Sequence, residues 1–264
     1  MSAAKALSPA VGSTQGRPMS QRLQRIDQLR ALALLWMTLY HLVFDLDHFG
    51  FVQQDMLGDP FWTTQRSAIV SLFLFTAGLS QAVALHQGQG WPRFWRRWAQ
   101  VAGAALLVTL GSWFVFPQSF IYFGVLHGIA LMLLIARFTG HWGGWLWPLG
   151  AIAMALPWAA PAAIAAWPAL DAMNQPGPNV LGFISRKPFT EDYVPLLPWL
   201  GVVWWGLAAG RWVLQQRPQW LGGAGQGGGA LARGMATWGR WSLSYYLLHQ
   251  PVLMGLIGLA ALAR

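Results

Sequence analysis

Residues 25–48 read RIDQLRALALLWMTLYHLVFDLDH, a stretch long enough for a membrane helix that nevertheless carries charged groups near both ends. At a helical spacing of three or four residues, the polar groups fall on one face. This face holds Asp27, Arg30, Leu34, Met37, His41, Asp45 and His48. It is ~30 Å long at ~1.5 Å per residue, close to the hydrocarbon thickness of a bilayer. An ionisable group facing lipid costs ~3 kcal/mol or more, so we expect this face to point inward, with the rest of the chain bundled around it.

The composition is that of a membrane protein rather than a soluble domain. Of the 264 residues, 55% are hydrophobic and only 9% are charged, whereas soluble domains have about 25% charged residues. The chain has room for about seven spans and no separate soluble domain. It contains no cysteine, which excludes disulfides, thiolate catalysis and cysteine-ligated metals.

Seven apolar runs are long enough to form membrane helices. They cover residues 29–50, 66–86, 97–116, 120–138, 143–166, 195–214 and 238–262. With seven spans, most of the 17 basic residues fall on one side, and the other side has only Arg66, Arg186, Lys187 and Arg264. The positive-inside rule then puts the N-terminus in the cytoplasm and the C-terminus outside. The net charge of +9 therefore reflects topology and does not indicate nucleic-acid binding.

The runs predict an all-α integral membrane protein, a bundle of about seven transmembrane helices in a single domain, 25–264. A disordered cytoplasmic tail, 1–24, precedes it. The fifth run contains Pro157 and Pro161, which predict a break or an early end. The long outer connection, 167–194, is either a lid or acceptor-binding surface or an ordinary solvated segment. The glycine-rich inner connection, 215–237, is expected to be a flexible linker.

Three histidines, His41, His127 and His249, fall within the apolar runs, in the middle or outer half of the membrane. A single core histidine is normally a packed structural residue, but three at similar depth favour a shared cavity that gives each a partner. Asp45 lies one turn beyond His41 and could orient its imidazole, or form an ordinary i,i+4 ion pair. Tyr245 shares a helix face with His249. No spacing typical of zinc ligands occurs, so no metal site is predicted.

Basic residues and tryptophans gather where the first and third runs begin. The arginines are Arg25, Arg30, Arg93, Arg96 and Arg97. Guanidinium groups match phosphate geometry, and tryptophan can stack on a purine, so this cluster suits an anionic nucleotide-like cofactor. Arginine and tryptophan at an inner interface are equally typical of topology anchors.

Four segments together resemble a known family. They are RIDQLRALALLWMTLYHLVFDL (25–46), FIYFGVLHGIA (120–130), EDYVPLLPWLGVVWWGLAAG (191–210) and RWSLSYYLLHQPVLMGL (240–256). In order and spacing they are similar to bacterial members of the heparan-alpha-glucosaminide N-acetyltransferase catalytic-domain family, across about 25–260. The resemblance implies a multi-pass membrane acyltransferase that moves acetyl from cytoplasmic acetyl-CoA to an amine or hydroxyl of an extracytoplasmic sugar.

The resemblance also suggests roles for the histidines. The polar position of the family's first helix falls on His41, where the lysosomal branch has asparagine and places its active-site histidine a little further on. His48 lies in that outer segment, at a shorter spacing, so the resemblance leaves open which of His41 and His48, if either, is the general base. His127, Tyr245 and His249 would position the acceptor or polarise the carbonyl. The five arginines would hold acetyl-CoA, the acyl donor.

Two other classes of function stay open from the sequence. Histidine and aspartate at membrane depth also suit a proton-coupled transporter, and a non-catalytic membrane scaffold would need neither. The arginine-rich, lysine-poor usage is typical of a GC-rich bacterial genome, which predicts an inner-membrane location with the lipid bilayer as the first partner. The oligomeric state, homo-oligomer included, is left open.

Overall fold

The computed structural model describes residues 24–221 and 229–263, and regular structure in these ranges is helical apart from one isolated bridge between Phe123 and Tyr193. The helices are α1 (Gln24–His48), α2 (Pro60–His86), α3 (Trp91–Val115), α4 (Val125–Thr139), α5 (Leu146–Ala166), α6 (Leu196–Gln216), α7 (Pro218–Leu221), α8 (Ala230–Arg240) and α9 (Ser242–Leu262). Short 3-10 helices are η1 (Gly143–Trp145), η2 (Pro168–Asn174) and η3 (Pro178–Leu181).

Five helices in the described ranges are long and apolar enough to cross a membrane. They are α1, α2, α3, the segment Gly143–Ala166 and α9. α4 is shorter, with 15 residues, and α6, with 21 residues, is not among the five. The predicted all-helical membrane protein is confirmed, whereas the count of seven spans and the sidedness stay predictions.

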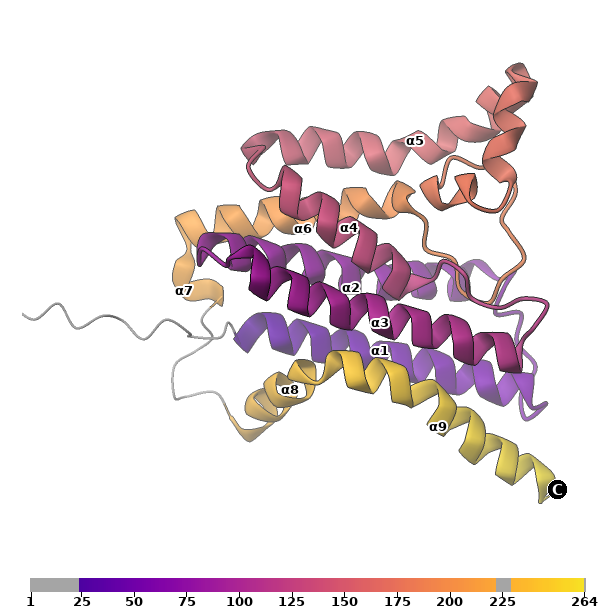
Figure 1. The fold of residues 1–264 in the computed structure, drawn as a ribbon. Coiled ribbons are helices and arrows are strands. Elements are labelled where there is room, and N and C mark those ends of the chain that lie inside the picture. Colours follow the sequence, from indigo (N-terminus) through magenta and orange to yellow (C-terminus); the bar gives the residue numbers. More distant parts are fainter. Residues whose placement is uncertain (1–23, 222–228, 264) are drawn as a thin grey trace, which may run out of the picture.

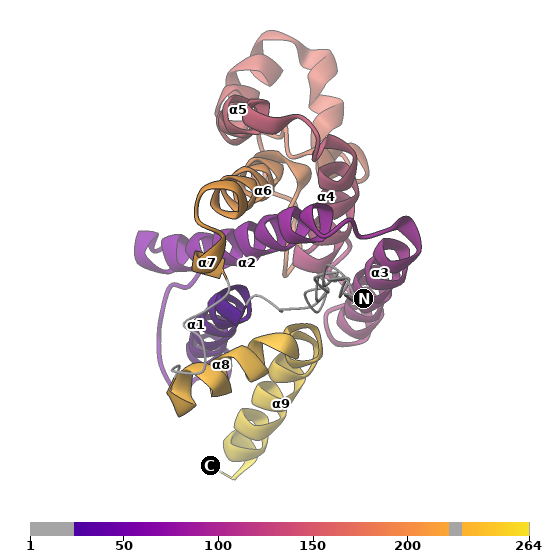
Figure 2. The same ribbon diagram turned by 90° about the vertical axis from the view of Figure 1, so that its left-hand side faces the viewer.

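The helices stack in the order α5, α6, α2, α1 and α8, each packing against the next (Figure 2). α4 packs on α2 and α6, and α3 packs on α4 and α9. The polar face of the first helix is turned inward as predicted, because Asp27, Leu34, Met37 and Asp45 are all buried.

The bundle has two ends, which we name by their contents. α1 and α3 begin at the arginine end, which carries Arg30, Arg93, Arg96 and Arg97 and lies to the left in Figure 1. The segment 167–195 lies at the opposite end, the loop end, where α2, α4 and α6 begin.

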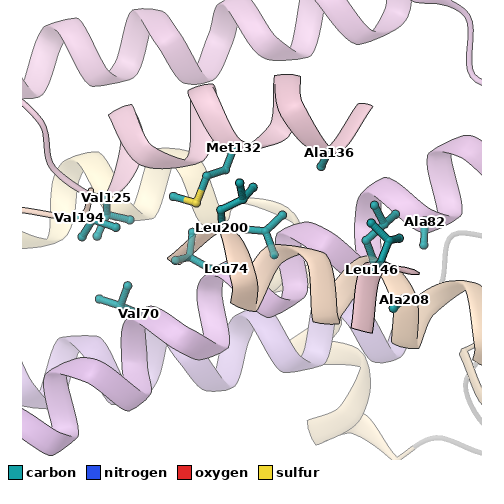
Figure 3. Packing of buried hydrophobic residues seen from close by; sticks show 12 residues of the cluster. Val70, Leu74, Ala82, Val125, Met132, Ala136, Leu146, Val194, Leu200 and Ala208 are labelled. Carbon is teal, nitrogen blue, oxygen red and sulfur yellow. The ribbon is translucent and has the colours of Figure 1, made fainter. Parts of the chain in front are cut away.

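The largest apolar cluster fills the space between α2, α4 and α6 (Figure 3). Leu74, Met132 and Leu146 are fully buried in it. Lipid tails are as apolar as leucine, so such a cluster stabilises a membrane bundle through close packing rather than through removal from water. The cluster makes α2 and α6 the rigid centre against which α1 is held.

Two glycines allow α2 and α6 to approach closely. A Cβ atom at Gly78 would overlap the backbone oxygen of Val203, and one at Gly206 would overlap the backbone oxygen of Phe75. Small residues at such crossings are typical of membrane helices, whose backbones can then meet.

Gly78→Ala is expected to destabilise the protein by about 1–3 kcal/mol, because the added methyl group must push two backbones apart. Thermal unfolding of the detergent-solubilised protein measures the change. Gly103→Ala is the matched control, since nothing lies within 4 Å of a Cβ atom there. An unchanged melting temperature for Gly78→Ala would show that α2 and α6 do not meet at this point.

Three sequence-based boundaries need correction. The run 120–138 begins its helix only at Val125, because residues 119–124 instead pair with the segment 190–194, for example Ser119 with Glu191. The predicted linker, 215–237, contains the end of α6, α7 and much of α8; its residues 222–228 lie outside the described ranges. The fifth helix is not broken, since α5 runs on through both of its prolines. The predicted tail lies outside the described ranges except for Gln24.

α8 packs against α1 through a close backbone contact and a side-chain hydrogen bond. Gly239 packs against the backbone of Asp27 so closely that a Cβ atom would overlap the Asp27 oxygen. The Gln28 side chain donates to the backbone oxygen of Ala232 at 3.1 Å. α8 is therefore held along the first half of α1 and leads directly into α9.

Candidate active site

Two of the predicted histidines meet between α1 and α9. His41 Nδ1 lies 2.7 Å from His249 Nε2, and the rings stack with centroids 5.0 Å apart. The two residues are 208 positions apart in the chain. His249 is buried, and His41 is partly buried.

The hydrogen bonds determine which ring nitrogens carry protons. A carbonyl oxygen only accepts, so His249 Nδ1, which lies 2.7 Å from the backbone oxygen of Tyr246, is the protonated nitrogen of its ring. In the neutral ring Nε2 is then an acceptor, and His41 Nδ1 donates to it. The lone pair of His41 is left on Nε2, which makes no hydrogen bond within the described ranges.

Tyr245 forms one wall of the histidine pair. Its ring is nearly parallel to the His249 ring, at 9° and 5.9 Å between centroids. Its hydroxyl lies 2.8 Å from Thr38 Oγ1, which itself donates to the backbone oxygen of Leu34. Because the Thr38 proton is used in that bond, the Tyr245 hydroxyl donates to Thr38. This bond fastens the start of α9 to α1 just before the two histidines.

A basic cavity of about 610 Å³ opens at the arginine end. Arg30, Arg93, Arg96 and Arg97 line it, together with Asp27 and Ser80. Arg30 is held in place, since one nitrogen contacts Asp27 Oδ1 at 2.6 Å and another donates to Ser80 Oγ at 2.5 Å. The other three arginines are exposed at the start of α3. Four guanidinium groups around one carboxylate make this cavity suited to a ligand with several negative charges.

A second cavity, of about 300 Å³, adjoins the first. Arg30, Ser80 and Arg97 line both cavities. The rest of its lining is mostly apolar and comes from α2, α3, α4 and α9, including Phe73, Trp98, Leu126, Ile129 and Tyr246. The Tyr246 ring lies 5.7 Å, centroid to centroid, from the His249 ring. Tyr246 thus separates the second cavity from His249.

The family model described as heparan-alpha-glucosaminide N-acetyltransferase, catalytic, matches residues 22–251, which is most of the chain. The chain belongs to this family. Membership implies a membrane acetyltransferase activity. A search of curated proteins and a search of solved structures each found no match.

In this member of the N-acetyltransferase family, Asp45 forms no hydrogen bond with His41. Its Oδ1 accepts a hydrogen bond of 2.7 Å from Gln250 Nε2 on α9. The hypothesis that Asp45 orients the His41 ring is therefore replaced by the direct contact with His249. Helical spacing correctly places His41 and Asp45 on one face of α1. Each of them, however, forms its hydrogen bond with a residue of α9 and not with the other.

The other two predicted histidines lie elsewhere. The Gly124 backbone N–H donates to His127 Nδ1 at 3.3 Å, and His127 Nε2 lies 3.0 Å from Thr109 Oγ1. Both nitrogens of His127 are thus used to join the start of α4 to α3, which is a structural arrangement. His48 is exposed at the end of α1, with its ring 5.1 Å from that of Phe49. It lies two turns, or ~10 Å, beyond His41.

The predicted arginines divide into two groups. Arg30, Arg93, Arg96 and Arg97 line the basic cavity, whereas Arg25 lines neither cavity and lies 5.5 Å from the ring of Trp220. Trp91 and Trp95 stack on each other outside the cavities, and only Trp98 lines the second one. The purine-stacking role considered for these tryptophans can therefore apply to Trp98 alone.

Sequence reasoning missed three contributors: Thr38, Tyr246 and Gln250. Thr38 precedes His41 by three residues and Tyr246 precedes His249 by three, so helical periodicity places each on the face of its histidine. Gln250 could not be found in this way, because its role depends on the rotation of α9 against α1.

At the loop end, charged groups from separate elements converge on Asp192. Its Oδ2 accepts from the backbone N–H of Val125 at 2.7 Å and so caps α4. Burial raises the pKa of the Asp192 carboxyl above its usual value, although the Val125 bond and the charges of Arg66 and Lys187 act in the opposite direction. The pKa of Lys187 is lowered, first by burial and then by Arg66.

We expect the raised pKa of Asp192 to make the protein less stable as the pH rises. A carboxyl whose pKa is higher in the folded state contributes stability fully below its unfolded pKa, and this stability is lost as the pH rises through the folded value. Asp192→Asn keeps an oxygen for Val125 but cannot ionise, so its melting temperature should fall less over the same pH range. Asp171→Asn, at an exposed ion pair with Arg186, is the control. Parallel melting curves for wild type and Asp192→Asn would contradict the assignment.

Proposed function

We propose that this chain transfers an acetyl group from acetyl-CoA, bound at the arginine end, to an amine or hydroxyl group of a sugar that approaches from the loop end. In this proposal the arginine end faces the cytoplasm, in line with the positive-inside rule. Family membership supports the acetyl transfer. The donor, the acceptor and the direction belong to the proposal.

The donor site is supported by the chemistry of the basic cavity. Acetyl-CoA carries its negative charge on the phosphates of its nucleotide portion. Arginine forms charge-assisted, often bidentate hydrogen bonds to phosphate oxygens. Arg93, Arg96 and Arg97 are exposed and free to turn toward such a group, while Arg30 is held by Asp27 and Ser80.

The observation that carries the proposal is that the two cavities adjoin and share Arg30, Ser80 and Arg97. A charged cavity at the arginine end lies beside a mostly apolar one, whose lining includes Tyr246, the neighbour of His249. A ligand with an anionic head and a long, thin arm that ends in a thioester matches this order of environments. The arm would bring the acetyl carbonyl to the histidine pair while the phosphates stay at the arginine end.

His41 supplies the base for the chemical step. Its Nε2 lone pair takes the proton from the attacking nitrogen or oxygen as the new bond to the acetyl carbon forms and the carbon–sulfur bond breaks. The leaving sulfur receives a proton as the free thiol. His249 Nε2 accepts from His41 Nδ1, so it stabilises the imidazolium that forms on His41. The same lone pair serves if the acetyl group first resides on His41 and is then passed on.

The test uses sealed vesicles of known orientation that contain the purified protein. Radiolabelled acetyl-CoA is added on the side of the arginine end, and a pool of amino sugars and glycans is placed on the other side. Label that accumulates in far-side products supports the proposal. Its absence with every acceptor, combined with no thermal shift on adding acetyl-CoA, would overturn it, because a ligand that binds the native state must stabilise it.

A further inference from the structure

Next to the histidine pair, a second contact joins α1 to α9, and it contains an acid. Asp45 has 0% of its surface exposed, and its Oδ1 accepts from Gln250 Nε2 at 2.7 Å. Asp45 follows His41 by one helical turn, and Gln250 follows His249 directly. The two contacts therefore fix the same stretch of α9 against the same stretch of α1.

The remaining oxygen atoms of this contact are both without a donor. Asp45 Oδ2 and Gln250 Oε1 are buried and make no hydrogen bond within the described ranges. An ionised carboxylate would leave Oδ2 with a negative charge and no donor, buried between α1 and α9. Buried charges of this kind are normally paired or neutralised.

A single proton removes the difficulty. A carboxylic acid and a primary amide can form a closed pair in which each donates one hydrogen bond and accepts another. The bond from Gln250 Nε2 to Asp45 Oδ1 is one half of such a pair, and a proton on Asp45 Oδ2 supplies the other half to Gln250 Oε1. We propose that Asp45 is an uncharged carboxylic acid paired in this way with Gln250, and that this pair is a positioning device that holds His249 against His41.

The charged and titratable groups around this pair fit the proposal. On α1, His41 lies one turn before Asp45 and is bonded to His249, while His48 lies one turn after it and is exposed to water. On α9, the neighbour His249 donates to a backbone carbonyl. None of these groups donates a hydrogen bond to Asp45, so the imidazolium formed on His41 would be stabilised by a second histidine and not by a carboxylate. The positioning role rests on the proposed function, whereas the uncharged state does not.

The uncharged state is tested directly by infrared spectroscopy of the purified protein. The wild type should show the carbonyl stretching band of a protonated carboxylic acid, and Asp45→Asn should lose it. Asp47→Asn is the control, because Asp47 accepts from the Gln54 backbone N–H near the loop end; this variant should keep the band. If Asp45→Asn instead loses a carboxylate band and leaves any acid band in place, the proposal is overturned. This measurement needs no activity, so it stands even if acetyl transfer fails.

The positioning role is tested by matched substitutions at Asp45. Asparagine can both donate to and accept from Gln250, so Asp45→Asn should keep kcat and the pH profile of acetyl transfer close to those of wild type. Asp45→Leu removes both bonds and should lower kcat by about 10²-fold, the cost typical of a misplaced catalytic group. A loss in Asp45→Asn as large as that in Asp45→Leu would show that the negative charge is required and would overturn the proposal. Retained activity in Asp45→Leu would overturn the positioning role.

Discussion

His41→Ala is expected to lower kcat for acetyl transfer by about 10²–10⁴-fold, the range typical of a lost general base. Binding of acetyl-CoA should be nearly unchanged, because His41 lines neither cavity. Initial rates in the vesicle assay give kcat, and the thermal shift produced by acetyl-CoA reports binding. The combination of lost turnover and retained binding is what separates a base from a structural residue.

The histidines that look similar in the sequence provide the controls. His48→Ala should leave turnover close to that of wild type, since His48 is exposed at the end of α1. His127→Ala should lower stability, because it removes the bonds to Gly124 and Thr109. His249→Ala should lower kcat less than His41→Ala does, since it removes the partner and not the base. Full activity in His41→Ala together with inactivity in His48→Ala would move the base to the outer segment.

The triple replacement of Arg93, Arg96 and Arg97 by glutamine is expected to raise KM for acetyl-CoA by about 10²-fold or more. A hydrogen bond to a charged group contributes ~1.5–3 kcal/mol, so the loss of two such bonds already accounts for a change of this size. The variant should also lose the thermal shift that acetyl-CoA produces. These arginines are exposed, so their replacement should leave the fold intact.

Arg25 is the matched control for that experiment. It belongs to the same basic cluster in the sequence but lies over Trp220 and lines neither cavity. Arg25→Gln should therefore leave KM for acetyl-CoA nearly unchanged. If Arg25→Gln weakened binding as much as the triple variant, the cluster would act through overall charge at the membrane surface and not as a donor site.

The helical face of α1 could be predicted from the sequence because periodicity depends only on local geometry. Its inward orientation followed from the cost of placing Asp27 and Asp45 against lipid. The partners of that face could not be predicted in the same way. His41 and His249 meet only because α9 is rotated and shifted to one position against α1, and no local pattern encodes that rotation. Asp45 was the natural candidate partner for His41 by spacing alone, and a tertiary contact took its place.

The remaining differences also have physical causes. His127 shows the same sequence signal as His41, a histidine in an apolar run, and only the contacts to Gly124 and Thr109 reveal that both of its nitrogens are used. The glycines before α8 suggested a flexible linker there, so the helix was not predicted. One glycine, at position 239, is in fact needed for α8 to pack on α1. The basic residues at the start of α3 were found because charge at a membrane interface is visible in any sequence, but which of them face a cavity depends on the packing of α1, α2 and α3.

The hydrogen-bonded chain from His41 through His249 stops at the backbone oxygen of Tyr246. That oxygen carries no hydrogen of its own to release, so a proton taken up by His41 can reach His249 and go no further inward. It must leave again from His41, and in the proposed reaction the leaving sulfur is the group that takes it. Turnover at this site would therefore exchange one proton for one acetyl group, and it would need no separate proton-conducting chain through the bundle.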